Sequence, residues 1–183
     1  NTLKYLRENQ PLIGVNPDPE RWDGVLLPFR VDELTAIVAE VLSGNYQKRE
    51  VTMAEATLND GQEILAVNDF FIGQRTHTSA RYIIESNGIQ ERHSSSGVIV
   101  STGLGSTGWL KSLLHGAAAI SAEVSGGEVA ANASSAGLSW EMEKLLFTVR
   151  EPFPSRATQA DLVFGEITPQ NPLKSRSLMP ENG

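Results

Sequence analysis

The sequence predicts an α+β fold in two parts, a partial α/β (Rossmann-like) opening followed by a larger antiparallel β domain. Residues 31–42 have the clearest helical period, strand patterns follow them, and an Asn-Gly dipeptide at 87–88 joins two strand-like runs. Antiparallel strands after an α/β opening indicate two subdomains. We place the boundary near residue 45, which gives a remnant of an α/β domain at 1–45 and a β-rich domain at 46–183.

The opening part contains two helical patterns and one short strand pattern. Residues 2–7 show apolar side chains at helical spacing, and Pro11 stops that helix. The apolar run 12–15 suits a buried parallel strand. Residues 31–42 place their apolar side chains on one face, and Gly44 closes the helix as a left-handed cap.

The second part is dominated by strand patterns. Residues 51–56 alternate, and a turn at 59–61 separates them from the apolar run 64–67. Residues 81–93 predict a hairpin, because Asn-Gly tolerates the positive φ angles of a type I′ turn. Further strands are predicted at 97–101, 145–149 and 160–164. Residues 116–139 contain 17 Gly, Ala or Ser in 24 positions, so we expect a flexible tract there.

Composition and charge exclude several classes of function. The 15 Lys and Arg against 22 Asp and Glu leave 15 − 22 = −7 formal charges, which argues against nucleic-acid and membrane-surface partners. The absence of Cys excludes thiol catalysis and zinc fingers. No run approaches the length that spans a bilayer, and residues 1–16 lack a signal-peptide pattern, so we expect a cytoplasmic protein.

A glycine-rich segment follows the strand predicted at 97–101. Residues 103–108 read G-L-G-S-T-G and match G-x-G-x-x-G, in which glycines let the backbone approach a ligand and helix-start N–H groups bind phosphate. A hairpin precedes this strand, which disfavours a Rossmann site, and Lys111 falls two positions too late for a Walker loop. A glycine-rich turn without a ligand remains the alternative.

Other polar residues have both a functional and a structural interpretation. Asn68 and Asp69 follow an apolar run, where an amide and a carboxylate can hold ribose hydroxyls or form a simple turn. Trp109 can stack on a base or pack in the core. The three histidines, at 77, 93 and 115, lack metal-like spacing, so we predict no metal site. Isolated cations are candidates for phosphate contacts or for solvated positions: Arg75, Arg81, Lys111, Arg150 and Arg156.

Two of these segments together resemble the NAD kinase family. That family carries an Asn-Glu or Asn-Asp pair on a strand and, later, a segment like D-G-L-I-V-S-T-P-T-G-S-T-A-Y. Here the pair is Asn68-Asp69, and residues 96–109 read S-G-V-I-V-S-T-G-L-G-S-T-G-W. The resemblance covers residues 3–112 and is most specific over 64–112. It implies an α/β amino-terminal domain, a carboxy-terminal β-sandwich and a nucleotide in the cleft between them.

The resemblance also implies an activity and its ligands. The family transfers a phosphoryl group from ATP to the 2′-hydroxyl of the adenosine ribose of NAD, with Mg²⁺ neutralising charge, and so produces NADP. It implies a homo-oligomer, a dimer or a tetramer. By position, the residues expected to bind the nucleotide are Asn68, Asp69, Ser96, Gly103, Gly105, Ser106, Thr107, Gly108, Trp109 and Ser112.

Departures from the family pattern keep alternatives open. The G-G-D-G loop that supplies the family's general base does not occur in the chain, so we expect the catalytic base upstream of Asn1. Ser96 stands where the family has Asp, and Gly103-Leu104 replaces Pro-Thr. The alternatives are a kinase of a different hydroxyl acceptor and a non-catalytic nucleotide-binding or regulatory protein. A Rossmann dehydrogenase domain is a third, and it requires a parallel sheet at 98–101.

Overall fold

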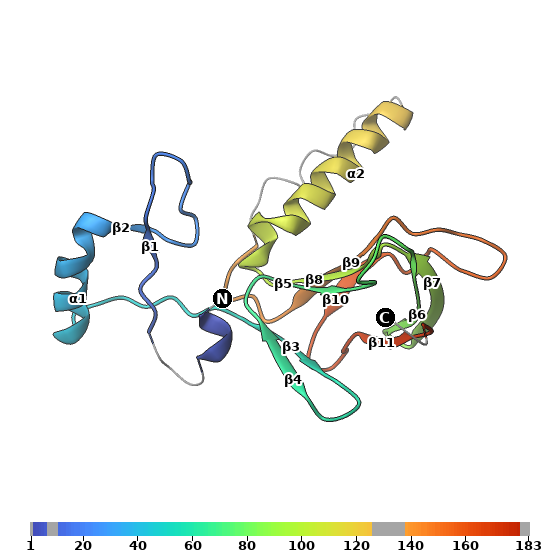
Figure 1. Cartoon of the computed structure of the whole chain (residues 1–183), viewed down its shortest axis with the longest axis horizontal. Coiled ribbons are helices and arrows are strands. Elements are labelled where there is room, and N and C mark those ends of the chain that lie inside the picture. The colour runs from blue at the N-terminus through green and yellow to red at the C-terminus, as the bar shows by residue number, and fades with distance from the viewer. Residues whose placement is uncertain (1, 7–10, 126–137, 180–183) are drawn as a thin grey trace. The chain divides into compact units, whose positions relative to one another are not determined.

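The computed structural model describes residues 2–6, 11–125 and 138–179 of the chain (Figure 1). Contacts divide the chain into two compact units, Asn1–Glu50 and Val51–Gly183. This division falls close to the boundary that the change of sequence pattern predicts near residue 45.

The first unit is small and mostly irregular. Its elements are η1 (Leu3–Tyr5), β1 (Val15–Asn16), β2 (Phe29–Arg30), η2 (Val31–Glu33) and α1 (Leu34–Leu42). The helix predicted at 31–42 is present as one 3-10 turn that continues into α1, and Gly44 follows it with a φ of 76°. β1 and β2 pair in parallel, although only the last residue of the strand predicted at 12–15 takes part. The helix predicted at 2–7 is a single 3-10 turn.

The second unit holds the main sheets. Its strands are β3 (Ala54–Thr57), β4 (Glu63–Ala66), β5 (Asp69–Ile72), β6 (Ala80–Ser86), β7 (Ile89–Ser95), β8 (Gly97–Ser101), β9 (Leu145–Arg150), β10 (Phe164–Ile167) and β11 (Lys174–Ser177). They form a four-stranded sheet β10-β9-β8-β5, a three-stranded sheet β11-β6-β7 and a hairpin β3-β4. Every pairing in this unit is antiparallel, which confirms the predicted α+β class.

The topology rejects the Rossmann interpretation of the glycine-rich segment. β8, which leads into that segment, is antiparallel to both of its neighbours, β5 and β9. A dinucleotide fold needs parallel strands joined by a crossover helix. The third alternative, a Rossmann dehydrogenase domain, is therefore wrong for this chain.

The core lies between the two larger sheets. Alternate residues of β6, β8 and β9 supply it, because successive side chains of a strand face opposite sides of its sheet. The buried apolar cluster consists of Ala80, Tyr82, Ile84, Val98, Val100, Phe147 and Val149. The large side chains in such a cluster contribute about 1.5–3 kcal/mol each on burial.

The hairpin predicted at 81–93 is the β6–β7 pair. Asn87 and Gly88 form its turn with φ angles of 51° and 76°, as a type I′ turn requires. The strand predicted at 160–164 is not formed over those residues. The strand in this region, β10, begins only at Phe164. Leu162 and Val163 instead pack on the core, and the Val163 carbonyl accepts a hydrogen bond from Val149 at 2.8 Å.

The small-residue tract is partly helical, unlike the flexible tract expected at 116–139. After η3 (Gly105–Thr107), α2 (Trp109–Ser125) runs through the first ten positions of the tract. Alanine has the highest helix propensity, so a run of alanines continues a helix that has already begun. Residues 126–137 lie outside the described part of the chain. No helix in the described ranges combines the length and apolar character needed to cross a membrane.

Candidate functional site

The structure brings the two predicted motifs together at one end of the β5–β8 ladder. Asp69 and Ser101 are register partners across these strands. Just beyond the ladder, the amide of Thr102 donates a hydrogen bond to the carbonyl of Asn68 at 2.9 Å. The Asn68-Asp69 pair and the start of the glycine-rich segment are therefore neighbours in space.

Thr102 ties the two segments to each other. Its hydroxyl donates to the carbonyl of Val67 at 2.5 Å and accepts from the amide of Gly105 at 3.0 Å. The side chain is completely buried. We did not predict a role for Thr102, although a hydroxyl residue at a strand end that bonds an amide three positions later is a known local motif.

Gly103 and Gly105 lie where the backbone packs directly against other backbone, so neither position has room for a side chain. A Cβ atom at Gly103 would lie 1.9 Å from the carbonyl oxygen of Ser139. A Cβ atom at Gly105 would lie 2.1 Å from the carbonyl oxygen of Asn68. Both glycines are buried, so they shape the turn from within and present no surface of their own.

Ser106 is also an internal support. Its hydroxyl donates to the carbonyl of Gly103 at 2.7 Å and accepts from the amide of Leu138 at 3.0 Å. The residue is 8% exposed. Three of the ten predicted site residues, Gly103, Gly105 and Ser106, thus hold the turn in shape.

Five predicted residues lie on the surface around this turn. Thr107 is half-buried, and its hydroxyl donates to the carbonyl of Leu104 at 3.3 Å. A Cβ atom at Gly108 would find one neighbour, at 3.5 Å, so the space above this glycine is open. The exposed predicted residues are Asn68, Gly108, Trp109 and Ser112.

Trp109 is partly a packing residue. Its ring lies 5.6 Å from the ring of Phe71, and the guanidinium of Arg150 lies 5.3 Å from the indole centroid. These contacts place the first residue of α2 over β5 and β9. The residue keeps 38% of its surface exposed, so both interpretations of Trp109 apply in part.

Asp69 is a half-buried carboxyl at the end of the β5–β8 ladder. Burial raises the pKa of its carboxyl above the usual 3.8, and a hydrogen bond with Ser101 opposes this shift in smaller measure. Its Oδ1 atom is buried without a hydrogen-bond partner among the described residues. A hydrogen-bond donor that reaches this buried oxygen would stabilise the carboxylate.

Ser96 does not join the other site residues. It precedes β8, whereas the glycine-rich turn follows β8, and a strand of that length separates its ends by about 3.3 Å per residue. The Ser96 hydroxyl instead donates to a carboxylate oxygen of Glu151, which lies just after β9. Glu151 has a φ of 48°, and its Oε1 atom lies 3.7 Å from an Nη atom of Arg150.

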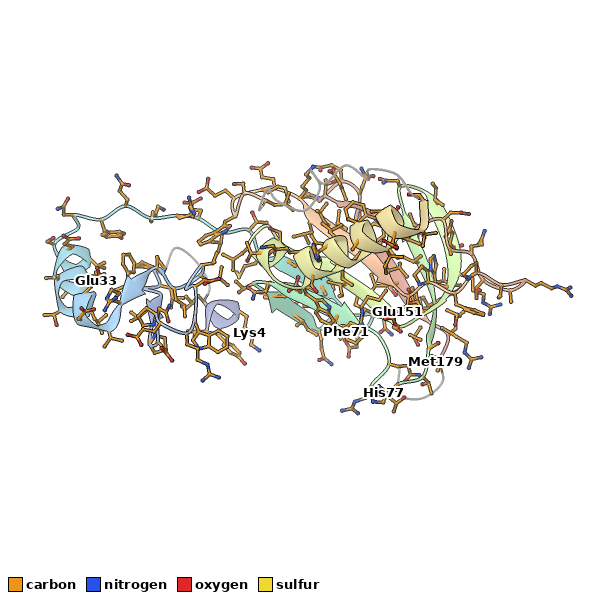
Figure 2. The ribbon with its side chains drawn as sticks, turned by 90° about the horizontal axis from the view of Figure 1, so that it is seen from above. Lys4, Glu33, Phe71, His77, Glu151 and Met179 are labelled. Atoms are coloured by element: carbon orange, nitrogen blue, oxygen red, sulfur yellow. The ribbon has the colours of Figure 1, made fainter. Side chains whose placement is uncertain are left out.

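No group of three or more His, Asp or Glu side chains that could hold a metal ion occurs within the described ranges. His77 is exposed on the loop between β5 and β6 (Figure 2). His93 is buried and lies 3.0 Å from Glu91.

Sequence comparison finds an enzyme relative. A curated NAD kinase from Chlorobium phaeobacteroides is 31% identical over 105 residues, which are 55% of this chain and 36% of that protein. No family model matches the chain. The chain thus spans about a third of the length of this curated relative.

Solved structures with the same fold are also kinases. A yeast NADH kinase complexed with NADH superposes with a TM-score of 0.53 at 19% identity, covering 83% of this chain and 39% of that one. An NAD kinase from Archaeoglobus fulgidus in complex with ATP gives a TM-score of 0.60 at 16% identity, covering 96% of this chain and 59% of that one. At these identities the likeness is one of fold.

Proposed function

We propose that this chain, which is NAD kinase-like in its motifs and fold, forms the nucleotide-binding part of a phosphotransferase. The proposed reaction moves a phosphoryl group from ATP to the 2′-hydroxyl of the adenosine ribose of NAD. One observation carries the proposal: Asn68 and Asp69 meet the turn that follows β8, through the 2.9 Å hydrogen bond between Thr102 and Asn68. These are the two segments on which the family resemblance rests.

Asn68 and Asp69 have complementary roles in the proposal. The exposed Asn68 amide offers both a donor and an acceptor to ribose hydroxyls. The Asp69 carboxylate offers acceptors only, and its unpartnered buried oxygen makes a hydroxyl donor favourable there. Together they can hold a pair of sugar hydroxyls in one orientation.

The turn itself offers the second half of the proposed surface. Gly108 is exposed with open space above it, and Thr107 beside it is half-buried. A nucleotide can lie close to the backbone there, because no side chain intervenes at Gly108. Trp109 and Ser112, both exposed on the first turn of α2, lie close in sequence to this surface.

The proposal places the proton-accepting carboxylate outside this chain. Phosphoryl transfer needs positioning, charge neutralisation and a base for the hydroxyl proton. No G-G-D-G loop occurs in the sequence, so we assign the base to residues encoded upstream of Asn1. Mg²⁺ would supply charge neutralisation on the ATP phosphates, which hold it together with water in many kinases.

Two features favour a second candidate, a related protein with another acceptor or with no turnover. Ser96 replaces the family's aspartate, and its hydroxyl is bonded to Glu151. Gly103-Leu104 replaces Pro-Thr in the same segment. A cytoplasmic location and a homo-oligomeric state are further parts of the proposal that come from the family resemblance.

One assay separates these functions. The protein translated from the whole reading frame is incubated with ATP, Mg²⁺ and NAD, and NADP is measured. Formation of NADP supports the first proposal. Turnover of ATP on another hydroxyl compound supports a different acceptor, whereas micromolar nucleotide binding without turnover supports a regulatory role. An absence of nucleotide binding contradicts all three.

A further inference from the structure

The outer face of the β11-β6-β7 sheet carries several arginines. Tyr82 and His93 are buried register partners whose rings stack, so their neighbours Arg81 and Arg92 face the opposite side of the sheet. The register pairs Arg92 with Ile83, which makes Arg81 and Arg92 diagonal neighbours across β6 and β7. Arg176 of β11 pairs with Ile83 from the other side and shares the same face.

These arginines are not neutralised by carboxylates in the described ranges. The neighbouring Lys174 has a partner, Glu85, at 2.8 Å. The Arg81 side chain donates a hydrogen bond from Nε to the thioether sulfur of Met179 at 3.3 Å, and sulfur is a weak acceptor. Arg81 and Arg92 are diagonal neighbours, a separation that long side chains can span, so their like charges repel each other. An anion that binds between them would remove this repulsion.

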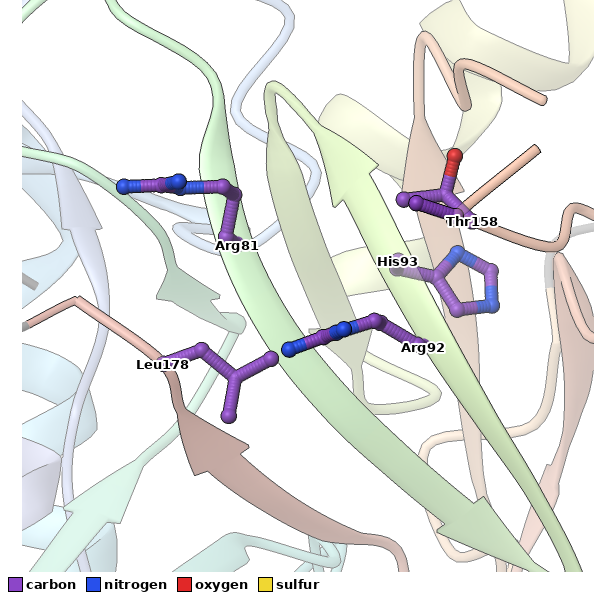
Figure 3. A pocket seen from close by; sticks show the side chains of 6 residues that line it. Arg81, Arg92, His93, Thr158 and Leu178 are labelled. Atoms are coloured by element: carbon purple, nitrogen blue, oxygen red, sulfur yellow. The ribbon is translucent and has the colours of Figure 1, made fainter. Parts of the chain in front are cut away.

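A depression on this face lies against two of the arginines. Its volume is about 200 Å³, and its lining includes Arg81, Arg92, Thr158 and Leu178. Figure 3 shows the Arg92 side chain extending across the β6–β7 pair toward Leu178. Arg176 lies on the same face but does not line the depression.

We propose that this depression binds the phosphate group of a small phosphorylated molecule. Planar guanidinium groups match phosphate oxygens with paired, charge-assisted hydrogen bonds. The net charge of −7 disfavours a polyanion such as nucleic acid, which needs an extended positive field. A volume of about 200 Å³ suits one small group. The depression lies on the β11-β6-β7 sheet, whereas Asn68 precedes β5 and Thr107 lies in η3, which follows β8 of the other sheet. The two proposed sites are therefore separate.

Phosphate titration of the ¹⁵N-labelled chain tests this inference. Inorganic phosphate is added at constant ionic strength, with chloride as the compensating anion, and the arginine Nε–Hε resonances are followed. We expect saturable shifts for Arg81 and Arg92. Arg81→Gln and Arg92→Gln should each weaken the phosphate affinity about tenfold, the effect of losing one charge-assisted hydrogen bond.

Arg176→Gln is the matched control, because it removes the same charge from the same sheet face outside the depression. It should change the phosphate affinity less than about twofold, the size of a weak long-range charge effect. An equal loss in Arg176→Gln and Arg92→Gln would mean a diffuse positive field and would overturn the proposal. Shifts no larger in phosphate than in chloride would overturn it as well. Unchanged backbone spectra of the variants show that each remains folded.

Discussion

The amide of Thr102 and the carbonyl of Asn68 lie 2.9 Å apart, and this hydrogen bond joins two segments that are distant in sequence. The Thr102 side chain adds two more bonds, to the carbonyl of Val67 and from the amide of Gly105. One buried threonine therefore satisfies backbone groups on both sides of the proposed nucleotide surface. Removal of the Thr102 hydroxyl leaves the Val67 carbonyl and the Gly105 amide without these hydrogen bonds.

Thr102→Val removes the hydroxyl and keeps the shape of the side chain. We expect a loss of about 1–3 kcal/mol in the free energy of unfolding, because buried polar groups lose their partners. Thr102→Ser keeps the hydroxyl and loses a methyl group, which costs about 0.8 kcal/mol. Urea unfolding of the three proteins measures both values. Equal stability of the valine variant and the wild type would contradict the proposed role of Thr102.

Gly105→Ala tests the close backbone contact inside the turn. The added Cβ would lie 2.1 Å from the Asn68 carbonyl oxygen, so the turn must move, at a cost of about 1–3 kcal/mol. Gly116→Ala is the control, since a Cβ there meets no atom within 4 Å and the residue lies inside α2. We expect this control to stabilise its helix by about 0.5–1 kcal/mol. Effects of the same sign would disagree with the structure.

Asp69→Asn tests the cost of the half-buried carboxylate through its pH dependence. Burial raises the pKa of Asp69 in the folded protein above 3.8, so the unfolded chain ionises first as the pH rises. The wild type therefore loses stability from about pH 3.8 upward until the folded carboxyl has ionised. Above that window the loss stays constant.

The asparagine variant lacks this titration. Its stability relative to the wild type should improve as the pH rises through the window, whereas its nucleotide affinity should fall because an acceptor for hydroxyls is gone. Thermal unfolding from pH 3 to pH 8 measures the first effect, and calorimetric titration with ATP measures the second. Parallel stability curves for the two proteins would show that Asp69 carries no such cost.

Arg150 and Trp109 form a pair whose energy can be isolated. The guanidinium lies 5.3 Å from the indole centroid, and a contact of this kind contributes about 0.5–1 kcal/mol at a partly exposed site. A double-mutant cycle with Arg150→Gln and Trp109→Leu should return a coupling energy of that size. Additive effects of the two substitutions would show that the contact contributes nothing to stability.

Local patterns were enough to predict several parts of the fold. The Asn87-Gly88 turn and the apolar run of β8 specify their structures within a few residues, so both were found from the sequence. The meeting of Asn68-Asp69 with the segment after β8 followed from the family motif. The hairpin and the strand patterns after residue 45 also predicted that the second unit is antiparallel. The α+β class followed from this.

The remaining features depend on contacts between distant residues. Gly103 and Gly105 were predicted to face a ligand, yet they face the backbone of Ser139 and Asn68, and no sequence spacing reports such a contact. The helical part of the small-residue tract was hidden because its composition is typical of flexible segments as well as of helices. The arginine-lined depression needs the pairing of β6 with β7, which places Arg81 and Arg92 on one face.

The most direct test is a nucleotide titration followed residue by residue. The ¹⁵N-labelled chain is titrated with ATP, and backbone amide shifts are mapped. We expect the largest shifts at Asn68, Thr107 and Gly108, and Asn68→Ala should weaken the affinity about tenfold, whereas Asn59→Ala, in the exposed β3–β4 turn, should leave it unchanged. Shifts confined to other parts of the chain, or equal affinity in both variants, would show that the two segments do not form a nucleotide-binding surface.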